Sequence, residues 1–439
     1  MTPSSEPRFS FRNVPPAIYV ALGLGVAGAL TFAIAALWST GELYERYQSL
    51  ERWRMLHTGC NTAATLLMAL GLLELSRRHV GSQRALTRAA AWLGLASLGW
   101  LAVPPLLAIL EPGPESWSAI HAWLGRGIGV LLLAGTVMLT LAAGAWRRVP
   151  LAAVGLIALD VTSYWVPVLG KELADLLGPD LSSRHVYGLI RHAVNVSATV
   201  FVVASLAAGG REPAPDPRAA AGGLRLARGV LIFRVMAAVA IAMLVVPGRS
   251  ADAAKIVAIL GPAVVIITML VLSIALQRVA SARLDGMPRL LLSLGAALTL
   301  WWGTIQVEQV TAILGALGDR FGAERALGIV QRFSVAGPLV ATLGLALVGS
   351  AIAMFAGHRG DVELRQAATG RTTTFVVLTL ASIALPLLAT TPTSAGSAVA
   401  LVVFTVIPAV LGLLALMALL AQAADAIEAE PGIPPARIL

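Results

Sequence analysis

Charged residues are scarce in this chain of 439 residues: Asp, Glu, Lys and Arg make up 13% of it, whereas a soluble domain carries about 25%. Hydrophobic residues make up 57% of the sequence. A protein with so little charge needs an apolar solvent, and the lipid bilayer is the one available. The composition therefore excludes an ordinary soluble protein and predicts a polytopic membrane protein with the bilayer as its main partner.

Cysteine and lysine are nearly absent as well. The single cysteine, Cys60, excludes an intrachain disulfide. Only Lys171 and Lys255 are lysine, so arginine supplies almost all of the positive charge behind the net charge of +9. The arginines lie in short gaps between apolar runs, which favours contact with the membrane surface over nucleic acid. Together with heavy use of Ala, Gly and Leu, this bias indicates a GC-rich bacterial genome and the bacterial inner membrane.

Twelve apolar runs are long enough to cross the bilayer as helices, since one crossing takes about 20 residues. The sequence therefore predicts an all-α transmembrane bundle with about twelve spans. The expected spans are 17–38, 57–76, 89–110, 122–146, 150–170, 187–209, 229–247, 255–277, 290–314, 333–357, 372–391 and 398–424.

Arginine also predicts the orientation of these spans. Clusters of arginine occupy every second gap, whereas the gaps 111–118 and 391–397 have no Lys or Arg. By the positive-inside rule both termini are cytoplasmic, which requires an even number of spans. A Pro- and Gly-rich stretch at 209–223 divides the spans into two groups of six. The predicted division is a cytoplasmic tail (1–16), a first six-helix half (17–209), a cytoplasmic linker (210–228), a second half (229–424) and a cytoplasmic tail (425–439).

A hairpin repeat is predicted within the first half. Three helices that return to the cytoplasm begin near a cation, at His57, Arg126 and Arg191, and the next cytoplasmic arginine follows after 20, 21 and 20 residues. That spacing is about one bilayer crossing at 1.5 Å per residue. Arg332 marks a fourth copy in the second half. The alternative is coincidence, because cations are common near the ends of membrane helices.

Asp160 is the residue that a membrane location explains least. It lies near the middle of the expected span 150–170, where an ionised carboxylate costs about 2.5–3.5 kcal/mol. It must face a cavity or a partner, or take up a proton. One hypothesis makes it a substrate-binding or proton-coupling group, with Tyr164 on the same helix face at i+4; the other makes it a structural acid. Arg191 is expected about half a leaflet away, so no ion pair with Asp160 is predicted.

A second polar cluster occupies the expected ninth span, in the segment WWGTIQVEQV. Trp301, Gln306, Glu308 and Gln309 make an unusually polar outer third of this span, and Glu308 and Gln309 cannot face lipid cheaply. They are candidates for a ligand site with an aromatic wall and amide donors. The alternative is an interfacial anchor with a polar helix end.

Arginine and histidine gather at the outer side of the bundle. Arg126, Arg191 and Arg332 either extend to lipid headgroups or line a vestibule that attracts anions. Four histidines are candidate metal ligands because neutral imidazole binds zinc, copper and haem iron: His57, His121, His185 and His192. The alternative is hydrogen bonding at headgroup level. No cofactor is predicted, and a haem or metal ion is left open.

These features favour a secondary transporter for a small solute or ion, with Asp160 and the 301–309 cluster as candidate sites. The alternative hypothesis is a non-transporting scaffold or a subunit of a complex with membrane-protein partners. A further alternative is a membrane-embedded redox or metal-binding protein. The sequence contains no phosphate loop, HExxH zinc motif or nucleophile elbow, so an enzyme is not favoured.

Overall fold

The computed structural model describes residues 13–38, 43–99, 114–143, 148–177, 181–209, 216–244, 251–282, 286–317, 323–388 and 395–429. These residues form thirteen helices and no strands. They divide into two compact units, Met1–Pro213 and Ala214–Leu439. The all-α prediction is confirmed for this part of the chain, while the count of twelve spans and the hairpin repeat stay predictions.

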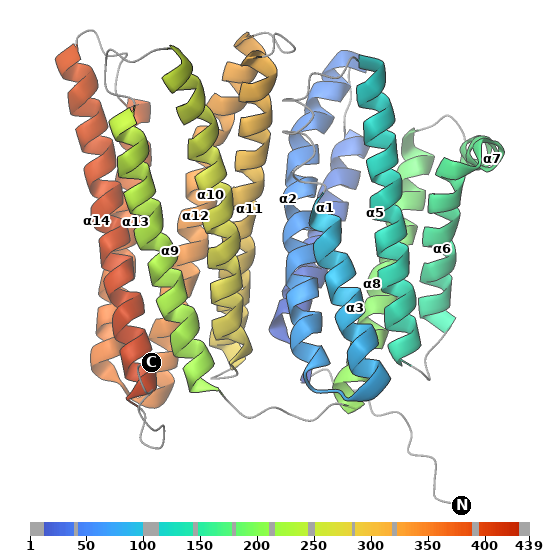
Figure 1. Cartoon of the computed structure of the whole chain (residues 1–439), viewed down its shortest axis with the longest axis horizontal. Helices are drawn as coiled ribbons and strands as arrows, with labels where there is room; N and C mark the ends of the chain where they lie inside the picture. Colours follow the sequence, from blue (N-terminus) through green and yellow to red (C-terminus); the bar gives the residue numbers. More distant parts are fainter. Residues whose placement is uncertain are drawn as a thin grey trace, which may run out of the picture. The chain divides into compact units, whose positions relative to one another are not determined.

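The first unit is a ring of six long helices with one short helix attached (Figure 1). Each long helix packs against the next one in the sequence, and the last packs against the first. The helices are α1 (Pro16–Trp38), α2 (Leu43–Ser76), α3 (Gly81–Ser97), α5 (Pro114–Ala143), α6 (Arg148–Trp165), the short α7 (Pro167–Leu177) and α8 (Leu181–Gly209).

The second unit has the same arrangement of neighbours. Six helices pack in sequence order, and the last one returns to the first. They are α9 (Pro217–Leu244), α10 (Ala251–Ser281), α11 (Gly286–Leu317), α12 (Ala323–Arg359), α13 (Val362–Leu388) and α14 (Ala395–Glu428). Arg225 on α9 donates to both carboxylate oxygens of Glu428 on α14, at 2.7 Å each, and so joins the two ends of the ring.

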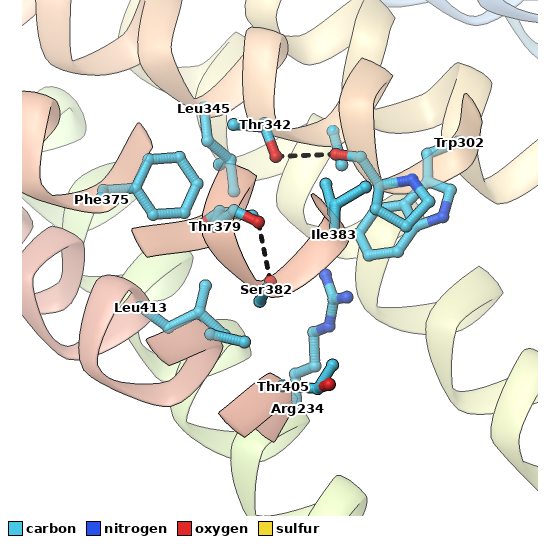
Figure 2. A pocket seen from close by; sticks show the side chains of 13 residues that line it. Arg234, Trp302, Thr342, Leu345, Phe375, Thr379, Ser382, Ile383, Thr405 and Leu413 are labelled. Carbon is cyan, nitrogen blue, oxygen red and sulfur yellow. Dashed lines mark hydrogen bonds between the residues drawn. The ribbon is translucent and has the colours of Figure 1, made fainter. Parts of the chain in front are cut away.

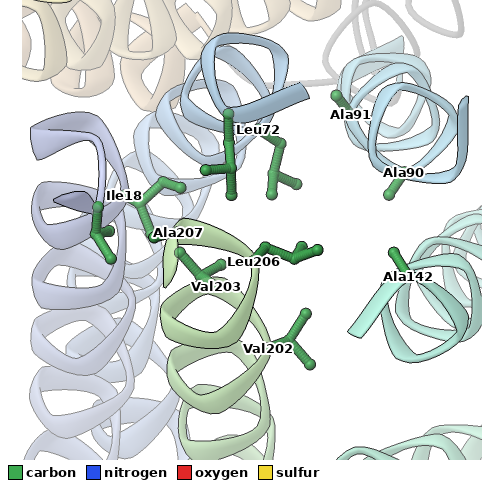
Figure 3. Packing of buried hydrophobic residues seen from close by; sticks show 11 residues of the cluster. Ile18, Leu72, Ala90, Ala91, Ala142, Val202, Val203, Leu206 and Ala207 are labelled. Carbon is green, nitrogen blue, oxygen red and sulfur yellow. The ribbon is translucent and has the colours of Figure 1, made fainter. Parts of the chain in front are cut away.

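Small and aliphatic side chains form the cores of both rings. In the first unit Ile18, Leu72, Val203 and Leu206 are buried between α1, α2 and α8, and alanines of α3 and α5 complete the cluster (Figure 3). In the second unit Gly295 lets α11 approach α12 closely, because a Cβ there would lie 2.8 Å from the Gly344 carbonyl oxygen.

Within the described residues, six helices contain a segment long and apolar enough to cross a membrane: Leu56–Ser76, Trp123–Ala142, Leu189–Ala208, Val264–Ser281, Gly337–Arg359 and Thr405–Glu428. Large apolar side chains are also exposed on the outsides of helices, among them Leu141, Phe233 and Leu343. A soluble protein rarely exposes so much apolar surface. The chain is therefore a helical membrane protein.

Two boundaries differ from the sequence-based expectation. Helix α9 begins at Pro217, inside the expected linker 210–228. Asp216 accepts a hydrogen bond from the Ala219 backbone N–H at 2.9 Å, which makes it an N-cap, and Pro217 takes the first helical position. The expected span 150–170 ends early, at Trp165, because Pro167 disfavours helical geometry at Val166.

Candidate functional site

An ion pair joins α6 and α8 in the first unit: the Arg191 guanidinium donates to the Asp160 carboxylate. The Arg191 and Asp160 side chains keep 38% and 26% of their surface exposed. The pair is therefore desolvated only in part and remains accessible to a small molecule. The sequence did not predict this pair, because Arg191 was expected about half a leaflet away from Asp160.

The helix boundary at Trp165 explains why the pair forms. With α6 ending there, Asp160 lies five residues from the end of its helix, or about 7.5 Å at 1.5 Å per residue. Arg191 lies ten residues into α8. Figure 1 shows α7 nearly end-on, so it runs across the direction of α6 rather than extending it. Asp160 is thus closer to the level of Arg191 than a continuous 150–170 helix would place it.

Each ring contains a cavity, with a volume of about 520 Å³ in the first unit and about 380 Å³ in the second. The cavity of the first unit, which we call cavity A, has a volume of about 520 Å³ and takes its lining from all six long helices. Such a volume suits a small-molecule ligand. Besides the ion pair, its polar lining residues are Asn61, Thr65, Ser97, Thr136, His192, Asn195 and Thr199.

Two of the four candidate metal-binding histidines lie near cavity A. Nδ1 of His57 is 3.0 Å from the Gly28 carbonyl oxygen, so it carries the proton, and Nε2 then accepts from the Asn61 amide at 2.9 Å. Nε2 of His192 is buried beside Gly25 of α1, 3.6 Å from where a Cβ at Gly25 would lie. Within those residues no group of three or more His, Cys, Asp or Glu side chains is placed to hold a metal ion.

Arg126 does not line cavity A. Its guanidinium lies 5.4 Å from the ring centre of Trp123 and 5.3 Å from that of Trp165. The two indoles meet edge to face, with their centres 5.1 Å apart. Both are largely exposed, and an arginine held over aromatic faces at such a place is typical of the membrane interface.

The second unit has its own cavity, cavity B, with a volume of about 380 Å³. Trp302 lines it and is buried, whereas its neighbour Trp301 is half-buried and does not line it. Arg234 of α9 points into the cavity beneath Trp302 (Figure 2). The sequence analysis did not single out Arg234, although an arginine inside the expected span 229–247 costs as much as Asp160 does.

The side chains of the remaining candidates lie outside the described part of the structure. They are Tyr164, Gln306, Glu308, Gln309, His121, His185 and Arg332. Their predicted roles as ligand, vestibule or metal-binding residues stay predictions.

Comparison of the chain with protein-family models, curated protein sequences and solved structures gave no match.

Proposed function

We propose that this chain is a secondary transporter that moves a small anion together with a proton, and that cavity A is its binding site. The observation that carries this proposal is the Asp160–Arg191 pair at the wall of a polar cavity within a membrane bundle. A guanidinium is the side chain best suited to bind carboxylate or phosphate through two parallel hydrogen bonds. In this structure the Asp160 carboxylate of the protein itself occupies the Arg191 guanidinium.

Protonation of Asp160 links the two cargoes. A proton on the carboxylate removes its negative charge and weakens its hold on Arg191, so the guanidinium is free to bind an external anion. The external anion then takes the place of the Asp160 carboxylate. Proton and anion therefore bind together, and loss of the proton restores the internal pair and expels the anion. Asn61 and Asn195 supply amide groups on the cavity wall.

Proteoliposomes test this coupling. The purified chain is reconstituted in vesicles that contain a pH-sensitive dye, and inward gradients of membrane-impermeant anions (succinate, glutamate, phosphate and sulfate) are imposed in turn. We expect at least one of them to acidify the interior. Asp160→Asn should bind that anion without moving protons, and Arg191→Gln should lose binding.

Two further variants serve as controls. Asp175→Asn removes an exposed carboxylate from α7 of the same unit and should behave as wild type. His192→Gln removes the other titratable group that lines cavity A and should keep proton movement. Proton transport by Asp160→Asn at the wild-type rate would contradict the proposal.

The proposed transporter crosses the bacterial inner membrane about twelve times, with both termini in the cytoplasm and with hairpins as its repeating unit. The alternation of arginine-rich gaps with gaps that are poorer in arginine or balanced by acidic residues supports this topology, as do the two rings of six helices. In a Cys60→Ala background, Thr2→Cys and Ile438→Cys should react with an impermeant maleimide in inside-out vesicles only. Labelling of either terminus in intact spheroplasts would contradict the orientation.

A further inference from the structure

Cavity B contains an arginine that no described carboxylate neutralises. Arg234 lies in α9, ten residues before Leu244, and its guanidinium carbon is 3.9 Å from the centre of the Trp302 ring. None of the described residues that line the cavity is acidic. A cation inside an apolar bundle without an acid is costly and is retained where something else supplies the negative charge.

Two hydrogen-bonding groups of cavity B are also unused. Nε1 of Trp302 and Oγ1 of Thr379 are buried without a partner among the described residues. By contrast, the Thr342 hydroxyl donates to the Pro338 backbone carbonyl and the Ser382 hydroxyl to the Thr379 backbone carbonyl, each at 2.7 Å. Buried polar atoms are usually satisfied, so each exception calls for a cause. A bound anion would pair with Arg234 and give the Thr379 hydroxyl an acceptor, whereas the N–H edge of the indole packs against Gly337.

Apart from the Thr405 hydroxyl, the rest of the described lining of cavity B is apolar. Leu345, Phe375, Ile383 and Leu413 form its walls, and Figure 2 shows them grouped around the space into which Arg234 points. A small hydrated anion such as sulfate would lose its water against these walls without compensation. A molecule with one acidic group and a hydrocarbon body fits both parts of the lining.

We propose that cavity B binds an amphipathic anion, with its carboxylate or phosphate on Arg234 and its hydrocarbon part along Phe375, Ile383 and Leu413. The site belongs to the second unit and does not depend on transport through cavity A. The same chemistry is available from a free fatty acid and from an anionic phospholipid.

Trp302 reports occupancy of the site directly. The full chain is placed in phosphatidylcholine nanodiscs, and the fluorescence of Trp302 is taken as the difference between wild type and Trp302→Phe. Bromine quenches indole on contact. Three probes are compared: a brominated stearate, its uncharged alcohol analogue, and brominated phosphatidylglycerol built into the disc.

We expect saturable quenching by one or both charged probes and none by the alcohol at equal concentration. Quenching by the stearate assigns a fatty acid, and quenching by phosphatidylglycerol alone assigns a bilayer lipid. Arg234→Gln should weaken binding about tenfold or more, since a hydrogen-bonded charge pair is lost. Thr379→Val removes one donor and should weaken it less. Arg228→Gln, which removes an exposed arginine from the same helix, should bind as wild type.

Three results would overturn the proposal: no quenching by either charged probe, equal quenching by the alcohol, or unchanged affinity in both Arg234→Gln and Thr379→Val. Glutamine is shorter than arginine and uncharged, so Arg234→Gln introduces neither a clash nor a new charge and is expected to fold. Thr379→Val keeps the shape of the side chain and serves as the second variant.

Discussion

Cavities A and B each place an arginine inside a ring of six helices, but the two arginines have different partners. Arg191 comes from the last helix of its ring and is paired with the Asp160 carboxylate. Arg234 comes from the first helix of its ring and lies against the face of an indole. The rings share an order of neighbours but not the position of the cation. The surroundings of each guanidinium, rather than the fold, therefore decide what it can bind.

The physical difference is that protonation of Asp160 can change the charge that Arg191 offers to a ligand, whereas the charge that Arg234 offers is constant. A proton can neutralise Asp160 and so expose the charge of Arg191. The indole of Trp302 has no proton to take up, so Arg234 presents a constant positive charge. Cavity A is suited to intermittent binding coupled to protons, and cavity B to a resident anion.

The largest effect is expected from breaking the pair of cavity A. Asp160→Asn or Arg191→Gln leaves one charge without its partner and should lower the free energy of unfolding by about 2–3 kcal/mol. This lies below the usual cost for a fully buried pair because the cavity leaves both groups partly exposed. Denaturant titration in detergent measures the loss. The double variant should recover most of it, and additive losses would show that the two residues are not coupled.

The next largest effect is expected at Gly337, which lies against the Trp302 ring, and is compared with that at Gly25, which lies beside the His192 ring. A Cβ at Gly337 would lie 2.8 Å from Cδ1 and Nε1 of Trp302, whereas a Cβ at Gly25 would lie 3.6 Å from the His192 ring. Gly337→Ala must therefore displace the indole and should cost about 1–3 kcal/mol, with a change in tryptophan fluorescence. Gly25→Ala should be neutral or stabilise by a few tenths of a kcal/mol. Equal effects of the two changes would contradict the close packing of Trp302.

A smaller effect of opposite sign is expected in cavity B. Arg234→Gln removes a charge that has no acidic partner among the described residues, so in lipid-free detergent it should raise the free energy of unfolding by about 1 kcal/mol. The same substitution at Arg191 should lower it. Thermal unfolding of the two variants side by side measures the difference. Destabilisation by Arg234→Gln would point to an acidic partner and would remove the contrast between the cavities.

The smallest effect concerns pH and the end of α2, outside the apolar segment. Burial lowers the pKa of His79 below its ordinary value of 6.5, and the neighbouring Arg78 acts in the same direction, although contacts with Leu206 and Gln83 oppose it. The folded chain then binds a proton less readily than the unfolded chain. The contribution of His79 to stability is complete above about pH 6.5 and falls as the pH drops toward its folded pKa. His79→Asn should lose this part of the pH dependence, and an unchanged profile would contradict the shift.

The sequence alone was enough to predict the helical class and to select Asp160 as a candidate residue. A carboxylate inside an apolar run stands out because membrane burial makes it costly. The pairing with Arg191 could not be predicted, because it depends on α6 ending at Trp165, five residues before the expected end of the span. Helix boundaries are the least certain part of any sequence-based prediction, and here an error of five residues hid an ion pair.

Cavity B shows a different limit. Trp301 and Trp302 are adjacent in an apolar helix, and nothing in the hydrophobic pattern tells which of them faces inward. Their orientation follows only from the packing of α11 against α12, where Gly337 makes room for Trp302. Arg234, by contrast, carried a usable signal, namely a lone cation inside an expected span, and the same cost argument that selected Asp160 would have selected it.

The most direct test of this account counts the protons that accompany anion binding to cavity A. The anion that acidifies the proteoliposomes is titrated into the purified chain by calorimetry, in two buffers with different ionisation enthalpies, and the difference gives the proton uptake. The account predicts uptake approaching about one proton per bound anion in wild type when the empty site is ionised, and none in Asp160→Asn. Binding to wild type without proton uptake at any pH tested would contradict it.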